Sequence, residues 1–192
     1  STGIGGPSTA IAVEELFRCG AHTMIRVGTC ASTSPKVGIG DIVIPNGAVR
    51  MEGVGLHYLP IEFPAVPDFS LVKELELAAI KLGYKYNIGI TISKASFYTQ
   101  TNPETKPVAH ELIEKWGAYE AGGATSTEME SAPLFLVGSS LKIRTAAVLV
   151  SATNFHEYSN DKRNYPGDLE HRAIETGIEA MRAVIRKDKG RE

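Results

Sequence analysis

Short β-rich runs alternate with amphipathic helical segments along the whole chain, and this order constrains the fold more than any other feature of the sequence. The spacing of apolar residues predicts helices at residues 8–20, 68–83, 108–116, 128–139 and 168–187. The predicted strands span residues 22–29, 41–45, 86–93 and 144–151. The last of these runs is almost wholly apolar, which is typical of a strand in a sheet covered on both faces. The pattern therefore predicts an α/β fold, a three-layer sandwich with a mixed, largely parallel central sheet.

The length and the beginning of the chain indicate its domain organisation. A chain of 192 residues with 43% hydrophobic and 22% charged residues is typical of one globular domain, so we expect residues 1–192 to form a single domain. Ser1 is followed almost at once by a glycine turn at residues 3–8, which normally comes directly after a strand. We therefore expect the chain to begin inside its fold and to lack an N-terminal segment.

Charge and cysteine content argue against several classes of function. A formal net charge of −2 and a pI near 6.2 provide no long-range attraction for nucleic acid or for an anionic membrane, so a small-molecule partner is expected. No apolar run approaches the length of a membrane span. Cys19 and Cys30 fit no metal-site or disulfide spacing, which indicates reduced thiols in a cytoplasmic protein.

Two features in the first part of the chain fit an anion site, because ligands of open α/β sheets bind where the strands end. The glycine turn at residues 3–9 precedes a helix, so it either presents backbone N–H groups to an anion or serves simply as a tight turn. Arg26 is a cation inside an apolar strand, and the hydroxyl of Thr29 follows close behind it. A buried guanidinium needs a partner, which is either an acidic side chain or a bound oxyanion.

Glu128, Met129 and Glu130 open the helix predicted at residues 128–139. Acidic residues in a first helical turn usually complement the helix dipole, and Glu128 is interpreted in this way. Glu130 has a second interpretation, because a carboxylate accepts hydrogen bonds from two vicinal ribose hydroxyls while a methionine packs against the apolar face of the sugar.

An aromatic pair and an amide follow the strand predicted at residues 86–93. Phe97 can stack on a flat base and Gln100 can contact its polar edge, although aromatic residues after a strand also serve as caps of the core. His57 and His156 are interpreted as structural or rim residues and not as catalytic groups.

Short motifs spread over nearly the whole chain are specific through their order and spacing. They lie at residues 1–9, 14–16, 26–29, 40–43, 63–69, 96–98 and 128–132. Together they resemble the nucleoside phosphorylase family, and within it the uridine phosphorylases.

The resemblance implies a pentosyltransferase that uses phosphate to convert uridine into uracil and ribose 1-phosphate. It assigns phosphate binding to Arg26 and Thr29, ribose binding to Met129 and Glu130, and base binding to Phe97, Gln100, Glu128 and Cys30. Arg26 and Glu130 are the expected catalytic residues. The family implies no metal or organic cofactor, and it implies active sites at the subunit interfaces of a homodimer or of a hexamer built as a trimer of dimers.

The sequence departs from the family at the residues that contact the base. Uridine phosphorylases follow their Phe-Tyr pair with a glutamine and, two residues later, an arginine, whereas Gln100 is shifted here and no arginine follows it. The aspartate of the purine branch corresponds to Ala152, with Asn154 as the nearest donor. Two alternatives therefore stay open, a purine nucleoside phosphorylase or nucleosidase on the same fold, and a non-catalytic nucleoside-binding relative.

Overall fold

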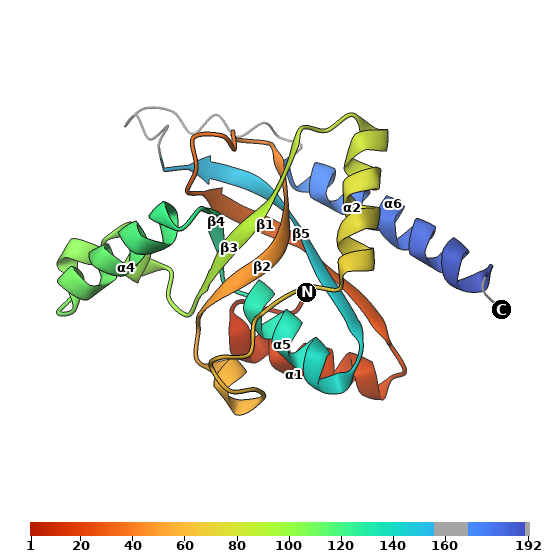
Figure 1. Ribbon diagram of the computed structural model, residues 1–192, viewed down its shortest axis with the longest axis horizontal. Coiled ribbons are helices and arrows are strands. Elements are labelled where there is room, and N and C mark those ends of the chain that lie inside the picture. Colours follow the sequence, from red (N-terminus) through yellow and green to blue (C-terminus); the bar gives the residue numbers. More distant parts are fainter. Residues whose placement is uncertain (156–168, 191–192) are drawn as a thin grey trace.

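Strands and helices alternate in the computed structural model, which describes residues 1–155 and 169–190 (Figure 1). The strands are β1 (Thr23–Ser32), β2 (Ile42–Met51), β3 (Tyr86–Lys94), β4 (Ala124–Glu128) and β5 (Arg144–Asn154). The longer helices are α1 (Gly6–Arg18), α2 (Phe69–Leu82), α4 (Ala109–Ala121), α5 (Ser131–Leu141) and α6 (Leu169–Lys189). The short helical turns are η1 (Val54–His57), α3 (Tyr98–Thr101) and η2 (Pro103–Thr105). The predicted α/β class is confirmed.

The strands form one mixed sheet that closes into a barrel in the order β1-β4-β3-β2-β5. The β1–β5, β2–β3 and β3–β4 pairs are parallel, and the β1–β4 and β2–β5 pairs are antiparallel. The mixed sheet is as predicted, but it differs from the open central layer of a three-layer sandwich. Register shifts at Cys30/Ala31 and at Pro45/Gly47 bend the long strands, and such irregularities increase twist, so the two edges of the sheet meet.

Strand β4 was not predicted, and it corrects the helix expected at residues 128–139. Its sequence, Ala-Thr-Ser-Thr-Glu, lacks the large apolar side chains that indicate a strand, yet Ser126, Thr127 and Glu128 are all buried. Glu128 is the last residue of the strand, and helix α5 begins at Ser131. The carboxylate of Glu128 accepts hydrogen bonds from the backbone N–H groups of Glu130 at 2.9 Å and Ser131 at 2.8 Å. It therefore does pair with free N–H groups at the start of a helix, which is α5.

Helix α2 shows how local chemistry sets the boundaries of an element. Asp68 is the N-cap residue, and its carboxylate accepts hydrogen bonds from the backbone N–H groups of Ser70 at 2.9 Å and Leu71 at 3.2 Å. Gly83 ends the helix with a left-handed φ of 73°. The helix predicted at residues 68–83 is confirmed at both ends.

Two pairs of helices cover the barrel and leave one region of strand ends open to a ligand. Helices α2 and α6 pack together over one apolar core, and α1 and α5 pack over a second (Figure 1). Helix α5 is apolar on nearly all sides, and its residues 131–138 are buried. Among residues 1–155 and 169–190, no helix is long and apolar enough to cross a membrane.

Candidate functional site

A cavity of about 600 Å³ lies beside the C-terminal half of β1 and the ends of β3, β4 and β5. The N-terminal turn at residues 1–4 closes one side of it. Its lining includes every residue that the sequence predicts to bind phosphate, ribose or base: Arg26, Thr29, Cys30, Phe97, Gln100, Glu128, Met129 and Glu130. The structure thus brings together residues from distant parts of the chain, as ligand binding at strand ends requires.

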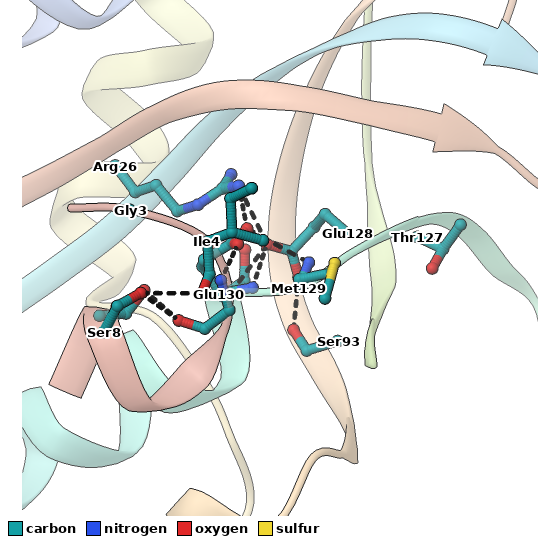
Figure 2. Close-up of polar contacts among 12 residues, drawn as sticks. Gly3, Ile4, Ser8, Arg26, Ser93, Thr127, Glu128, Met129 and Glu130 are labelled. Carbon is teal, nitrogen blue, oxygen red and sulfur yellow. Dashed lines mark hydrogen bonds and ion pairs between the residues drawn. The ribbon is translucent and has the colours of Figure 1, made fainter. Parts of the chain in front are cut away.

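Arg26 is held on one side by carboxylates and is unpaired on the other. Its Nη2 forms an ion pair with Glu130 and lies 3.5 Å from Oε2 of Glu128 (Figure 2). Its Nη1 is buried and has no hydrogen-bond partner in the described part of the chain. A buried donor without a partner costs free energy, so this side of the guanidinium is suited to an oxyanion. The sequence left an acidic side chain and a bound oxyanion as alternative partners of Arg26. The guanidinium can bind both, the carboxylate at Nη2 and the oxyanion at Nη1.

Gly28 provides the space in which the guanidinium of Arg26 lies. A Cβ atom at Gly28 would come within 2.8 Å of Nη1 and 3.0 Å of Cζ of Arg26. Any larger residue at this position therefore displaces the arginine head from the cavity.

The glycine turn before α1 binds an anion, but that anion belongs to the protein. The backbone N–H of Gly5 donates a hydrogen bond to Oε1 of Glu130 at 2.6 Å. Gly5 is the N-cap of α1 with a φ of 86°, a conformation that favours glycine. The turn, the carboxylate and Arg26 form one connected polar group, and Figure 2 shows these residues converging from the turn, from β1 and from the start of α5.

Glu128 is engaged at both of its oxygens. One oxygen accepts the two backbone N–H bonds at the start of α5, and the other accepts a hydrogen bond from the hydroxyl of Ser93. The side chain is almost fully buried, so it reaches the cavity as part of the wall. This arrangement supports the helix-start interpretation of Glu128.

The lining of the cavity also includes Phe97, Gln100 and a residue that the sequence analysis missed, Lys94. The Nζ of Lys94 donates a hydrogen bond to Oγ1 of Thr127 at 3.1 Å and lies 5.7 Å from the centroid of the Phe97 ring. Oγ1 of Thr127 in turn lies 3.5 Å from Oε1 of Gln100. The available signal was a lysine at the end of a predicted strand, three residues before Phe97.

Burial alters the acidity of both Lys94 and Cys30. Desolvation lowers the pKa of Lys94 from its ordinary value of 10.5 to about 8, although the charges of Glu128 and Glu130 act in the opposite direction. Desolvation, together with the charge of Glu128, raises the pKa of Cys30 to about 12. Cys30 is therefore a neutral thiol in the cavity wall at physiological pH.

His57 and Asn154, which the sequence also singled out, do not line the cavity. His57 lies in η1, away from the lining, and His156 lies outside the described residues. The side-chain amide of Asn154 donates a hydrogen bond to the backbone oxygen of Val37 at 2.9 Å, so Asn154 holds a loop and does not face a base. Within residues 1–155 and 169–190, no group of three or more His, Cys, Asp or Glu side chains is placed to hold a metal ion.

Comparison with known proteins gives the family to which the chain belongs. A family model described as the phosphorylase superfamily matches residues 1–186. The chain is 44% identical over 191 residues to a uridine phosphorylase of Treponema pallidum. The aligned region covers 100% of this chain and 74% of that protein. It is 36% identical over 191 residues to a uridine phosphorylase of Escherichia coli, with 96% of this chain and 74% of that protein covered. A guanosine phosphorylase of Halorubrum lacusprofundi is 31% identical over 185 residues, with 96% of this chain and 72% of that protein covered. The chain is a member of the phosphorylase superfamily.

Proposed function

We propose that the protein is a uridine phosphorylase, a pentosyltransferase that converts uridine and phosphate into uracil and ribose 1-phosphate. The observation that carries the proposal is the lining of the cavity, which combines the unpaired Nη1 of Arg26 with Phe97 and Gln100. The likeness to uridine phosphorylases over nearly the whole chain supports it. We further propose a single-domain cytoplasmic enzyme that needs no cofactor and acts as a homodimer or a hexamer.

Different residues of the cavity bind the phosphate and the ribose in the proposed reaction. Arg26 and Thr29 bind phosphate, and the ion pair with Glu130 fixes the plane of the guanidinium so that Nη1 points to a phosphate oxygen. Glu130 also accepts hydrogen bonds from the ribose hydroxyls, and Met129 packs against the sugar. Phosphate held in this way places negative charge beside the positive charge that develops on the sugar as the glycosidic bond lengthens.

A purine nucleoside phosphorylase is the second candidate. The likeness to a guanosine phosphorylase favours it, as does the lack of an arginine two residues after Gln100, where uridine phosphorylases carry one. The residues that contact the base decide whether the protein accepts a pyrimidine or a purine nucleoside.

The test measures release of base from uridine and from inosine by the purified full-length protein, each with and without phosphate. We expect release of uracil that depends on phosphate. Release of hypoxanthine would assign the protein to the purine branch, release without phosphate would make it a nucleosidase, and no release from either nucleoside would favour a non-catalytic relative.

A pair of arginine variants tests the assignment of the phosphate site. Arg26→Met is expected to lower phosphorolysis by roughly 100-fold to 1000-fold, the usual loss when one donor to a developing charge is removed. The matched control is Arg186→Met, because Arg186 is exposed on α6, where its guanidinium lies 3.6 Å from the carboxylate of Glu179. Equal activities of the two variants would refute the role of Arg26.

A further inference from the structure

We propose that Lys94 is the cationic residue that contacts the base, and that it stabilises the negative charge that the base acquires as the glycosidic bond breaks. The inference rests on the proposed function of the cavity, and it adds a residue to which neither the motifs nor the family match assigns a role.

The ammonium group of Lys94 is buried with most of its hydrogen-bonding capacity unused. The residue is 4% exposed, and within the described part of the chain Nζ donates one hydrogen bond, to Oγ1 of Thr127 at 3.1 Å. An ammonium carries three donors, and leaving donors unpaired in a buried position is unfavourable. A lysine with such an environment on the wall of a ligand cavity is suited to a polar ligand atom.

The position of Lys94 selects the base and not the phosphate as that ligand. Nζ lies 5.7 Å from the centroid of the Phe97 ring, and Thr127 links it to Gln100. A flat base that packs against Phe97 therefore has its carbonyl oxygens beside the ammonium. The unpaired Nη1 of Arg26 is the candidate donor to the phosphate.

The titratable groups around Lys94 do not consume its donors. Cys30 of β1, Glu128 of β4 and Glu130 before α5 face the ammonium electrostatically, but in the described residues neither carboxylate forms an ion pair with it. Glu128 is engaged with Ser93 and the start of α5, and Glu130 with Arg26 and the glycine turn. From α4, the ring of Trp116 lies 6.0 Å from Nζ and completes the apolar surroundings.

Lys94 assists the step in which the glycosidic bond breaks. The bond between C1′ of the sugar and the ring nitrogen of the base breaks, and its electron pair stays on the base. An oxygen of hydrogen phosphate forms a bond to C1′, and the proton that this phosphate loses is taken up, through water, by the released base. Lys94 donates a hydrogen bond to a carbonyl oxygen of the base throughout and transfers no proton itself.

The test compares Lys94→Met, Lys94→Arg and the control Lys81→Met with the unmodified full-length protein, because Lys81 is an exposed lysine of α2 that pairs with Glu179. The substrates are uridine and 5-fluorouridine, each with phosphate. The fluorinated base carries negative charge more readily, so it needs less stabilisation. We expect Lys94→Met to lower kcat/KM about 100-fold for uridine and clearly less for 5-fluorouridine, with the KM for phosphate unchanged. Lys94→Arg is expected to recover part of the loss.

Equal losses for the two substrates, an unchanged kcat/KM, or an effect confined to the KM for phosphate would overturn the inference. Calorimetric binding of uracil separates this inference from the proposed function. A protein that does not split uridine, but binds uracil about tenfold more tightly than its Lys94→Met variant, would refute the proposed reaction and support the base contact. Equal affinity of the two proteins for uracil would refute the base contact, whatever the enzyme activity.

Discussion

Replacing Lys94 with methionine is expected to stabilise the fold at neutral pH while it impairs the proposed reaction. Lys94 is 4% exposed, and desolvation lowers its pKa from 10.5 to about 8. One pKa unit corresponds to about 1.4 kcal/mol, so keeping Lys94 charged inside the folded protein costs about 3 kcal/mol. Methionine has a similar length and no charge, and it removes this cost.

The stability gained by Lys94→Met depends on pH, because the folded and the unfolded chain bind different numbers of protons at Lys94. Below pH 8 Lys94 is charged in the folded and the unfolded chain, and the full cost is present. Between pH 8 and pH 10.5 the folded protein has released the proton while the unfolded chain still binds it, so the stability of the unmodified protein rises with pH. Above pH 10.5 both states are neutral, and the cost disappears.

Urea unfolding of the unmodified protein and of Lys94→Met at pH 7 and at pH 10.5 measures this difference. The advantage of the variant is expected to be about 3 kcal/mol larger at the lower pH, which corresponds to roughly 6–12 °C in Tm for a chain of this size. Lys81→Met, at an exposed position, is the control and is expected to show no such change. An advantage of Lys94→Met that is the same at both pH values, or larger at high pH, would refute the assignment of Lys94 as a buried cation.

Three further changes test other parts of the structure. Gly28→Ala is expected to raise the KM for phosphate roughly 10-fold to 100-fold with little loss of stability, because the new Cβ displaces the head of Arg26; unchanged phosphate kinetics would contradict this. Asp68→Ala removes the N-cap of α2 and is expected to lower the free energy of unfolding by about 1 kcal/mol in urea titrations, whereas an unchanged midpoint would show that the cap contributes nothing. Alkylation by iodoacetamide, followed by mass spectrometry, is expected to modify exposed Cys19 and to spare Cys30 in the folded protein, and rapid modification of Cys30 would disprove its burial as a neutral thiol.

The connection between Arg26 and Glu130 links the two substrates of the proposed reaction. The same carboxylate that is assigned to ribose holds the guanidinium assigned to phosphate, and it is anchored by the backbone of Gly5. Loss of Glu130 would therefore affect both binding sites, so effects of changes at Glu130 and Arg26 are not expected to add.

The sequence by itself determined the features that depend on neighbouring residues. The alternation of apolar patterns predicted the α/β class and the mixed sheet, and Asp68 with Gly83 marked the ends of α2. The ordered motifs identified the family and named eight residues that all line the cavity: Arg26, Thr29, Cys30, Phe97, Gln100, Glu128, Met129 and Glu130. These features were accessible because helix caps, strand periodicity and motif spacing are properties of short segments.

The tertiary structure decided what depends on residues far apart in the chain. Closure of the barrel follows from bent strands whose edges meet, and β4 is too polar to be recognised until its neighbours bury it. The pairing of Arg26 with Glu130 joins residues 104 positions apart. Lys94 became a candidate for base recognition only when packing buried its ammonium beside Phe97 and Thr127, because the cost of burying a charge depends on surroundings that no local pattern encodes.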